Sequence, residues 1–136
     1  MYKETITYTD YNDEERTEDF YFNLTETEIS MLQLGTEGGL REKLERIMKS
    51  NDKPEIIKFF KEMIDITYGE KTPDGRRFIK SPELSKAFSE TEAYNIFFMK
   101  LATDSDTAIN FLNGIIPKAL RAEMPGDLRE LIPQKN

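Results

Sequence analysis

Asp104-Ser105-Asp106 resembles the start of a calcium-binding loop, because it places oxygen ligands close together along the chain. An EF-hand loop also needs a glycine at its sixth position and a bidentate glutamate at its twelfth. Isoleucines stand at both places, Ile109 and Ile115. The sequence therefore argues against a calcium site in this segment.

Two further segments carry residue types that bind anions in other proteins. The glycine-rich segment 35–39 precedes a predicted helix, but it lacks the Gly-Lys-Ser or Gly-Lys-Thr ending of a P-loop and no predicted strand leads into it. A joint between two helices is the favoured interpretation. The pair Arg76-Arg77 lies beside Glu70 and Asp74, and these acidic neighbours favour a solvated turn over an anion site.

Histidine and cysteine are absent from all 136 residues. Their absence removes the side chains that most often transfer protons near neutral pH, the usual nitrogen and sulfur ligands of transition metals, and the thiol nucleophile. An enzyme made from this chain would need a cleft that joins buried carboxylates or a lysine with shifted pKa values. The sequence instead predicts a protein without catalytic residues, metal or cofactor, which acts by presenting a surface.

The net charge of −7 resides in the first 30 residues. They contain nine acidic and two basic residues, which gives −7, whereas the remaining 106 residues have 17 of each and balance to zero. Nucleic acids and anionic membranes attract basic surfaces, so neither is a predicted partner. Two interpretations stay open: a charged edge that keeps a hairpin from pairing with other strands, or an acidic patch for a basic protein partner.

The expected compartment is the cytosol. No apolar run approaches the roughly 20 residues that a membrane-spanning helix needs. The first residues lack the basic and apolar regions of a signal peptide, and without cysteine there are no disulfides.

Period-two alternation predicts two strands near the N-terminus. Residues 2–9 place Tyr2, Ile6 and Tyr8 on one face, and residues 16–24 place Phe20 and Phe22 on one face. Turn-forming residues lie between these strands, so we expect a β-hairpin over residues 2–24. An isolated hairpin is marginally stable, which means that its aromatic face should pack on helices.

Helical spacing and capping residues predict about five to six short helices over residues 25–117. Thr25 and Glu28 form a capping-box pattern, and Ser89-Glu90-Thr91-Glu92 forms a second one. Gly69 is expected to end the helix that begins near Pro54, and a short strand is expected over residues 76–79. The predicted fold class is α+β, with one domain over residues 1–117 and a helical turn plus a loosely ordered tail over residues 118–136.

The helices predicted over residues 90–102 and 108–116 carry apolar side chains on more than one face. Such a helix is either buried or docked onto a partner. Core packing is the commoner reason for the aromatic cluster, but exposed apolar surface of this kind marks partner binding. The candidate partner-binding residues are Tyr94, Phe97, Phe98, Met99, Phe111, Leu112 and Ile115.

Several strings along residues 2–117 are distinctive as sequences, although they do not place reactive side chains at the spacing of a known chemical motif. They are YKETITYTDY (2–11), RTEDFYFNL (16–24), YGEK (68–71), PDGRRFIKS (73–81), FS (88–89), TEAY (91–94) and NGIIP (113–117). In these strings the chain resembles the tail assembly chaperones of long-tailed phages and prophages of Gram-positive bacteria. None of the strings is a catalytic motif.

The resemblance implies a non-enzymatic role in the host cytoplasm. Such chaperones bind the tape measure protein, a long and largely helical chain, keep it soluble and help to recruit tail tube subunits, and they are absent from the finished virion. The implied partners are the tape measure protein, the tail tube protein and a longer frameshift product, and self-association is left open. An alternative of another class is a structural tail completion or connector protein that stays in the particle.

The family often makes its longer product by programmed ribosomal frameshifting near the end of the short reading frame. Gln134-Lys135-Asn136 is compatible with a run of adenines ending AAAAAAC, a slippery heptamer. This is a hypothesis about the gene, because other codons encode the same peptide.

Overall fold

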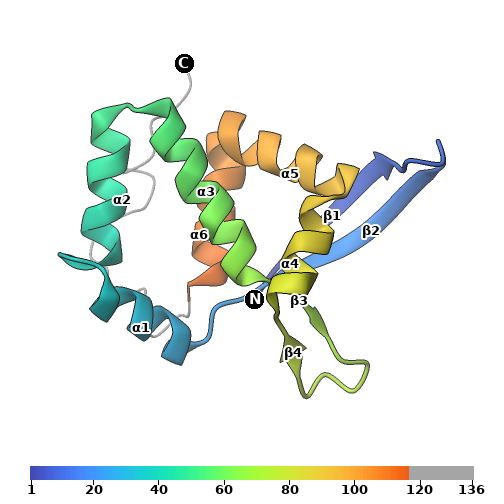
Figure 1. Ribbon diagram of the computed structural model, residues 1–136, viewed down its shortest axis with the longest axis horizontal. Helices are drawn as coiled ribbons and strands as arrows, with labels where there is room; N and C mark the ends of the chain where they lie inside the picture. The colour runs from blue at the N-terminus through green and yellow to red at the C-terminus, as the bar shows by residue number, and fades with distance from the viewer. Residues whose placement is uncertain (117–136) are drawn as a thin grey trace.

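The computed structural model describes residues 1–116 as a four-stranded antiparallel sheet with six helices, which confirms the α+β class (Figure 1). The strands follow the order β1-β2-β3-β4 in the sheet. They are β1 (Tyr2–Thr9), β2 (Glu15–Phe22), β3 (Tyr68–Lys71) and β4 (Phe78–Ile79). The helices are α1 (Glu26–Gly35), α2 (Gly39–Ser50), α3 (Lys53–Thr67), α4 (Pro82–Ser89), α5 (Glu92–Thr103) and α6 (Ser105–Ile115). The helical turn and tail predicted over residues 118–136 lie outside the described residues.

The N-terminal hairpin forms as its alternation predicts. Tyr2 pairs with Phe22 and Thr9 with Glu15, so the two strands are in register over their full length. One face is polar, with Thr7 hydrogen-bonded to Thr17 at 2.9 Å across the strands. The other face points into the core and buries Ile6 and Phe22, because successive side chains of a strand lie on opposite faces.

A network centred on Asp10 fixes the turn of this hairpin. Its carboxylate accepts the backbone N–H groups of Asn12 and Glu14 at 2.8 and 3.0 Å, and the guanidinium of Arg16 at 2.6 Å. The Arg16 hydrogen bond and the Glu14 N–H lower the pKa of Asp10. Asp13 takes a left-handed conformation, with φ of 63°, which short polar residues tolerate.

Side-chain caps begin α1, α3, α4, α5 and α6, and one of the two capping boxes that the sequence predicts is present. Thr25 and Glu28 form the predicted capping box of α1, since each side chain binds the other residue's backbone N–H. Asp104 caps α6. The second predicted capping box is wrong, because α5 is capped by Thr91 and Ser89 is the last residue of α4.

Strand β3 is the main element that sequence reasoning missed. Gly69 does not end a helix: α3 stops at Thr67 and the chain runs directly into β3. A Cβ atom on Gly69 would lie 2.6 Å from the carbonyl oxygen of Ile79, so glycine allows β4 to approach this closely. Two residues of β3, Tyr68 and Gly69, pair with β2, and the hairpin thereby becomes a four-stranded sheet.

The centre of the core is the ring of Phe22, which is fully buried. Its centroid lies 5.0 Å from that of Phe97, 5.6 Å from Phe111, 5.8 Å from Tyr68 and 5.9 Å from Phe88. These rings come from α5, α6, β3 and α4, so one side chain of the hairpin joins four other elements. Aromatic pairs in tilted and edge-to-face geometry add stabilisation beyond their buried area.

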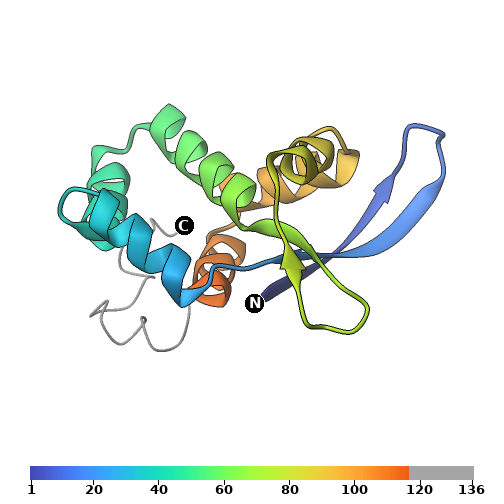
Figure 2. The ribbon, with the colours of Figure 1, turned by 60° about the horizontal axis from the view of Figure 1, so that its bottom comes forward.

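The described residues form an elongated arrangement (Figures 1 and 2). The arm formed by β1 and β2 projects at one end, and α1 with α2 lies at the opposite end. Helices α5 and α6 pack against β1 between these ends. Gly114 brings α6 close to β1, because a Cβ atom there would lie 2.7 Å from the Tyr2 ring.

We expect Phe22→Ala to lower the free energy of unfolding by about 3–5 kcal/mol, because it leaves a cavity where five elements meet. Urea denaturation followed by circular dichroism measures the change. Tyr11→Ala is the control: Tyr11 is 74% exposed at the hairpin turn, and its loss should cost less than about 0.5 kcal/mol. Equal losses in the two variants would contradict the central role of Phe22.

Candidate partner-binding surfaces

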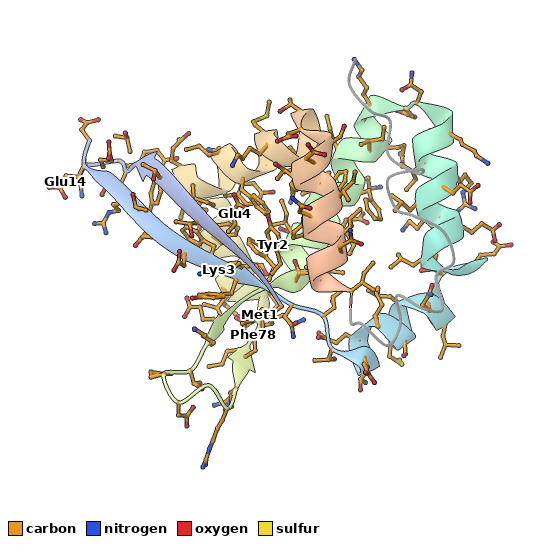
Figure 3. All side chains as sticks on the ribbon, turned by 180° about the vertical axis from the view of Figure 1, so that it is seen from behind. Met1, Tyr2, Lys3, Glu4, Glu14 and Phe78 are labelled. Carbon is orange, nitrogen blue, oxygen red and sulfur yellow. The ribbon has the colours of Figure 1, made fainter. Side chains whose placement is uncertain are left out.

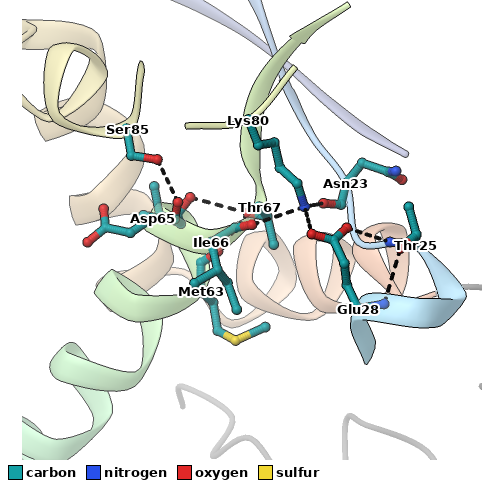
Figure 4. Close-up of polar contacts among 10 residues, drawn as sticks. Asn23, Thr25, Glu28, Met63, Asp65, Ile66, Thr67, Lys80 and Ser85 are labelled. Carbon is teal, nitrogen blue, oxygen red and sulfur yellow. Dashed lines mark hydrogen bonds and ion pairs between the residues drawn. The ribbon is translucent and has the colours of Figure 1, made fainter. Parts of the chain in front are cut away.

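The best-defined polar cluster of the described residues surrounds Lys80, which follows β4. Its ammonium donates to Glu28 Oε2 at 2.6 Å, to the carbonyl of Asn23 at 2.9 Å and to the carbonyl of Ile66 at 3.2 Å (Figure 4). An ammonium has three N–H bonds, and three acceptors surround this one. The cluster therefore acts as a clamp between α1, α3 and the segment after β2, and Lys80 is not presented as a free nucleophile.

Sequence reasoning did not single out Lys80, because its three acceptors come from distant parts of the chain. Two of them are backbone carbonyls, which carry no sequence signal. The Lys80 ammonium that binds the Ile66 carbonyl lies at the C-terminal end of α3, where the helix dipole favours a cation. The sequence marks this position in one way only: Lys80 directly precedes Ser81, the residue that caps α4.

A surface depression of about 610 Å³ opens beside this clamp, between α3 and α4. Its lining includes lysines, serines and carboxylates, and two of its lysines form ion pairs with carboxylates of the same lining. Lys61 lies 3.0 Å from Asp65, and Glu28 is held by Lys80. Ser85 donates its hydroxyl to the carbonyl of Asp65 at 2.7 Å. These contacts give Glu28, Lys61, Asp65, Lys80 and Ser85 structural roles.

The structure buries most of the predicted partner-binding set. Tyr94, Phe97, Phe111, Leu112 and Ile115 belong to the core, so the expectation that they form exposed surface is wrong for these five. The physical reason is that α5 contacts β1 on one side and α3 on another, and α6 contacts β1 as well. Most of the apolar surface of these helices is therefore covered within the chain.

The other two members of the set remain accessible to different degrees. Phe98 is half-buried and stacks on Tyr94 with ring centroids 5.8 Å apart. Met99 is 56% exposed on the outer side of α5. Of the seven predicted residues, Met99 is the one that presents a large apolar side chain to solvent.

Helix α1 carries the most exposed apolar side chains in the described helices, and sequence reasoning missed them. Leu34 is 85% exposed and Met31 is 67% exposed, whereas Ile29 of the same helix is fully buried. Residues three apart lie on the same helix face, so Met31 and Leu34 are neighbours. At about 100° per residue both lie roughly opposite Ile29. A helical-wheel projection of the sequence would therefore place them on the face away from the buried side.

The hairpin arm presents the acidic surface that the charge distribution predicts. Asp13, Glu14, Glu15, Glu18 and Asp19 are all exposed, and Glu14 lies at the tip of the arm (Figure 3). The hydrogen bond from the Tyr8 hydroxyl to Glu18 raises the pKa of this tyrosine to about 12. The polar face of these strands faces solvent, since Thr5, Thr7 and Thr17 are all exposed.

A notch of about 370 Å³ lies at the base of this arm. Residues 18–21 of β2 form one wall and residues 68–71, which make up β3, form the other. The two strands pair at the closed end of the notch and separate from there. Its rim is acidic and its lining includes the aromatic residues Phe20 and Tyr68.

A family model described as a phage tail assembly chaperone matches residues 1–134. The match spans nearly the whole chain, including every strand and helix given above. The chain belongs to the phage tail assembly chaperone family. The resemblance seen in the sequence strings is thereby confirmed at the level of the family, and the role of this family is non-enzymatic. No curated protein and no solved structure matches the chain.

Two further observations concern the described part of this chaperone. Residues 1–116 contain no group of three or more acidic side chains arranged to hold a metal ion. Among the same residues, no helix combines the length and the apolar character needed to cross a membrane.

We expect Lys80→Met to lower the free energy of unfolding of the chaperone by about 1–3 kcal/mol, the range for losing hydrogen bonds to a charged group. The methionine keeps most of the apolar stem but leaves Glu28 and two carbonyls without their donor. Lys86→Met, on the exposed surface of α4, is the matched control and should change stability little. Equal stabilities of the two variants in urea denaturation would exclude a clamp.

The clamp also predicts a pH dependence. Burial raises the pKa of Glu28, but the hydrogen bonds from Lys80 and the Thr25 N–H lower it by more, so the pKa lies below 4.5, the ordinary glutamate value. A carboxylate with a lowered folded-state pKa stabilises the fold above the unfolded-state pKa, and this contribution disappears as the pH falls through the folded-state value. Below pH 4.5 we therefore expect the free energy of unfolding to fall more steeply in the wild type than in Glu28→Gln. Parallel pH profiles would contradict the assignment.

Proposed function

We propose that this chain binds the tape measure protein in the host cytoplasm, keeps it soluble before assembly and helps to recruit tail tube subunits around it. Membership of the tail assembly chaperone family supports the proposal. The observation that carries it is the exposed apolar face of α1, with Leu34 85% and Met31 67% exposed. An exposed apolar helix face is a suitable contact for the apolar side of a long amphipathic helix.

The acidic residues around this face favour binding that stays reversible. Glu26 and Glu37 are exposed near the two ends of α1, and they keep the surface charged beside the apolar side chains. Apolar contacts with a charged rim are the usual composition of transient interfaces. Met99 on α5 is a second proposed contact, while the five buried members of the predicted set support α5 and α6 from inside.

Further features of the proposal follow from the family resemblance alone. We propose that the chaperone is absent from the mature virion, that the phage infects Gram-positive bacteria, and that a slippery run near the codons of residues 134–136 produces a longer frameshift product. Reading the gene tests the last point, since a sequence without such a run removes it. Residues 134–136 lie outside the described part of the structure.

Co-expression with the tape measure protein tests the central claim. We expect the wild-type chaperone to raise the soluble fraction of the tape measure protein, and Met31→Ser combined with Leu34→Ser to reverse most of that gain. Tyr11→Ser is the matched control, because Tyr11 is also exposed but lies at the far end of the molecule. If the wild type leaves the tape measure protein insoluble, the proposal fails. If the double variant matches the wild type, α1 is not the contact.

Mass spectrometry of purified virions separates the chaperone from the structural alternative. We expect peptides of this chain to be missing from mature particles, because an assembly factor leaves once the tail tube has closed around its client. A tail completion or connector protein would be present in a fixed ratio to the other tail proteins, and that result would overturn the assembly role proposed above.

A further inference from the structure

We propose that the free edge of β2 is a docking site for an extended, lysine- or arginine-rich segment of another protein, which adds to the sheet as a further strand. This inference concerns the hairpin arm and does not depend on the proposed role of α1. The arm and α1 lie at opposite ends of the described residues (Figure 2).

The free edge arises because β3 leaves β2 after a short pairing. Only Tyr21 and Phe22 of β2 have β3 partners, while Glu70 and Lys71 of β3 pair with β4 instead. Within residues 1–116, residues 15–20 of β2 therefore have a neighbouring strand on one side only, which is β1. A strand edge without a partner presents N–H and C=O groups that another chain can bind.

The backbone direction at this edge follows from the pairing pattern. The N–H of Asn23 donates to the carbonyl of Thr67 at 2.9 Å, so Asn23 faces the β3 side. Backbone groups of alternate residues in an antiparallel strand point the same way. The N–H and C=O groups of Thr17 and Asp19 therefore point toward the open side, away from β1.

The notch at the base of the arm gives this edge a defined end and a place for one apolar side chain. Phe20 and Tyr68 line it, and both rings pack on Phe88, with centroids 5.1 and 4.2 Å away. Lys71 lies over the ring of Tyr21, 4.7 Å from its centroid. An incoming strand alternates its side chains between the two faces, so one residue meets the aromatic lining while its neighbours meet the rim.

Charge selects the occupant. Residues 10–19 contain six acidic side chains and one basic one, Arg16, whose guanidinium is held by Asp10 at 2.6 Å. Two of these six, Glu18 and Asp19, line the notch itself together with Glu70. Lysine or arginine side chains of an added strand would neutralise this field, whereas a second copy of the same arm would bring like charges together. The edge is thus protected against self-pairing but remains open to a basic segment.

Two proline variants test the edge. In Thr17→Pro the backbone N–H on the open side of β2 is lost, and in Thr7→Pro the equivalent N–H on the far side of β1 is lost. Thr7 and Thr17 are cross-strand partners joined by one hydroxyl hydrogen bond, so each variant loses that same contact. Circular dichroism and urea denaturation check that both variants are folded and equally stable before their binding is compared.

The probe is a fluorescein-labelled peptide of alternating lysine and valine, eight residues long like β2, with blocked ends. Fluorescence anisotropy measures its binding. We expect Thr17→Pro to weaken binding at least about tenfold, which corresponds to one or two backbone hydrogen bonds, and Thr7→Pro to leave it unchanged. A peptide N-methylated at alternate amides keeps its charge but lacks the backbone donors, and it should lose affinity to the same extent.

Glu18→Gln combined with Asp19→Asn tests the part of the proposal that concerns charge. We expect these substitutions to weaken binding and to flatten its dependence on salt concentration, because exposed charges are screened by salt. Three results would overturn the proposal: no binding to the wild type at low salt, equal binding by the two proline variants, or equal binding of the N-methylated peptide. A dimer of the wild type that Thr17→Pro abolishes would overturn the assignment to another protein.

Discussion

The end of α3 is the constraint on which the rest of this structure depends. A helix leaves its last four carbonyls without intrahelical donors, and here the helix passes directly into a strand inside the protein. Each carbonyl finds a donor from a different place in the chain. These donors are the N–H of Tyr68, the hydroxyl of Ser85, the ammonium of Lys80 and the N–H of Asn23. The helix end therefore determines where β2, β4 and α4 lie.

The consequence is a rigid centre with two separate surfaces at its ends. The aromatic cluster around Phe22 fills the space that these hydrogen bonds define, and it buries most of the apolar surface of α5 and α6, with Met99 of α5 left exposed. Surface for partners is left at α1, where Met31 and Leu34 are exposed, and on the acidic hairpin arm. A protein without catalytic or metal-binding chemistry in its described residues can thus offer two kinds of contact, one apolar and one polar, that do not compete for space.

Local patterns in the sequence predicted much of the fold. The hairpin alternation and the Thr25 capping box depend on residues close together in the chain, and both are present. The prediction failed where distant residues decide. The sequence predicts that Gly69 ends a helix, yet β2 and β4 lie on either side of it and make it part of a strand. The expected exposure of five of the seven predicted partner-binding residues was wrong for the same reason, since apolar helical faces look alike whether another helix or a partner covers them.

By itself the sequence determined the N-terminal hairpin, the helical segments, the acidic arm and the absence of histidine and cysteine chemistry, and its strings indicated the family to which the chain belongs. Only the tertiary structure decided which apolar faces stay in water. Phe97 and Phe111 are sealed beneath β1, while Leu34 remains outside. It also decided that β2 keeps a free edge, because β3 turns away to pair with β4. Periodicity fixes which side chains share a face, but burial depends on what packs against that face, and this is set by contacts between residues far apart in the chain.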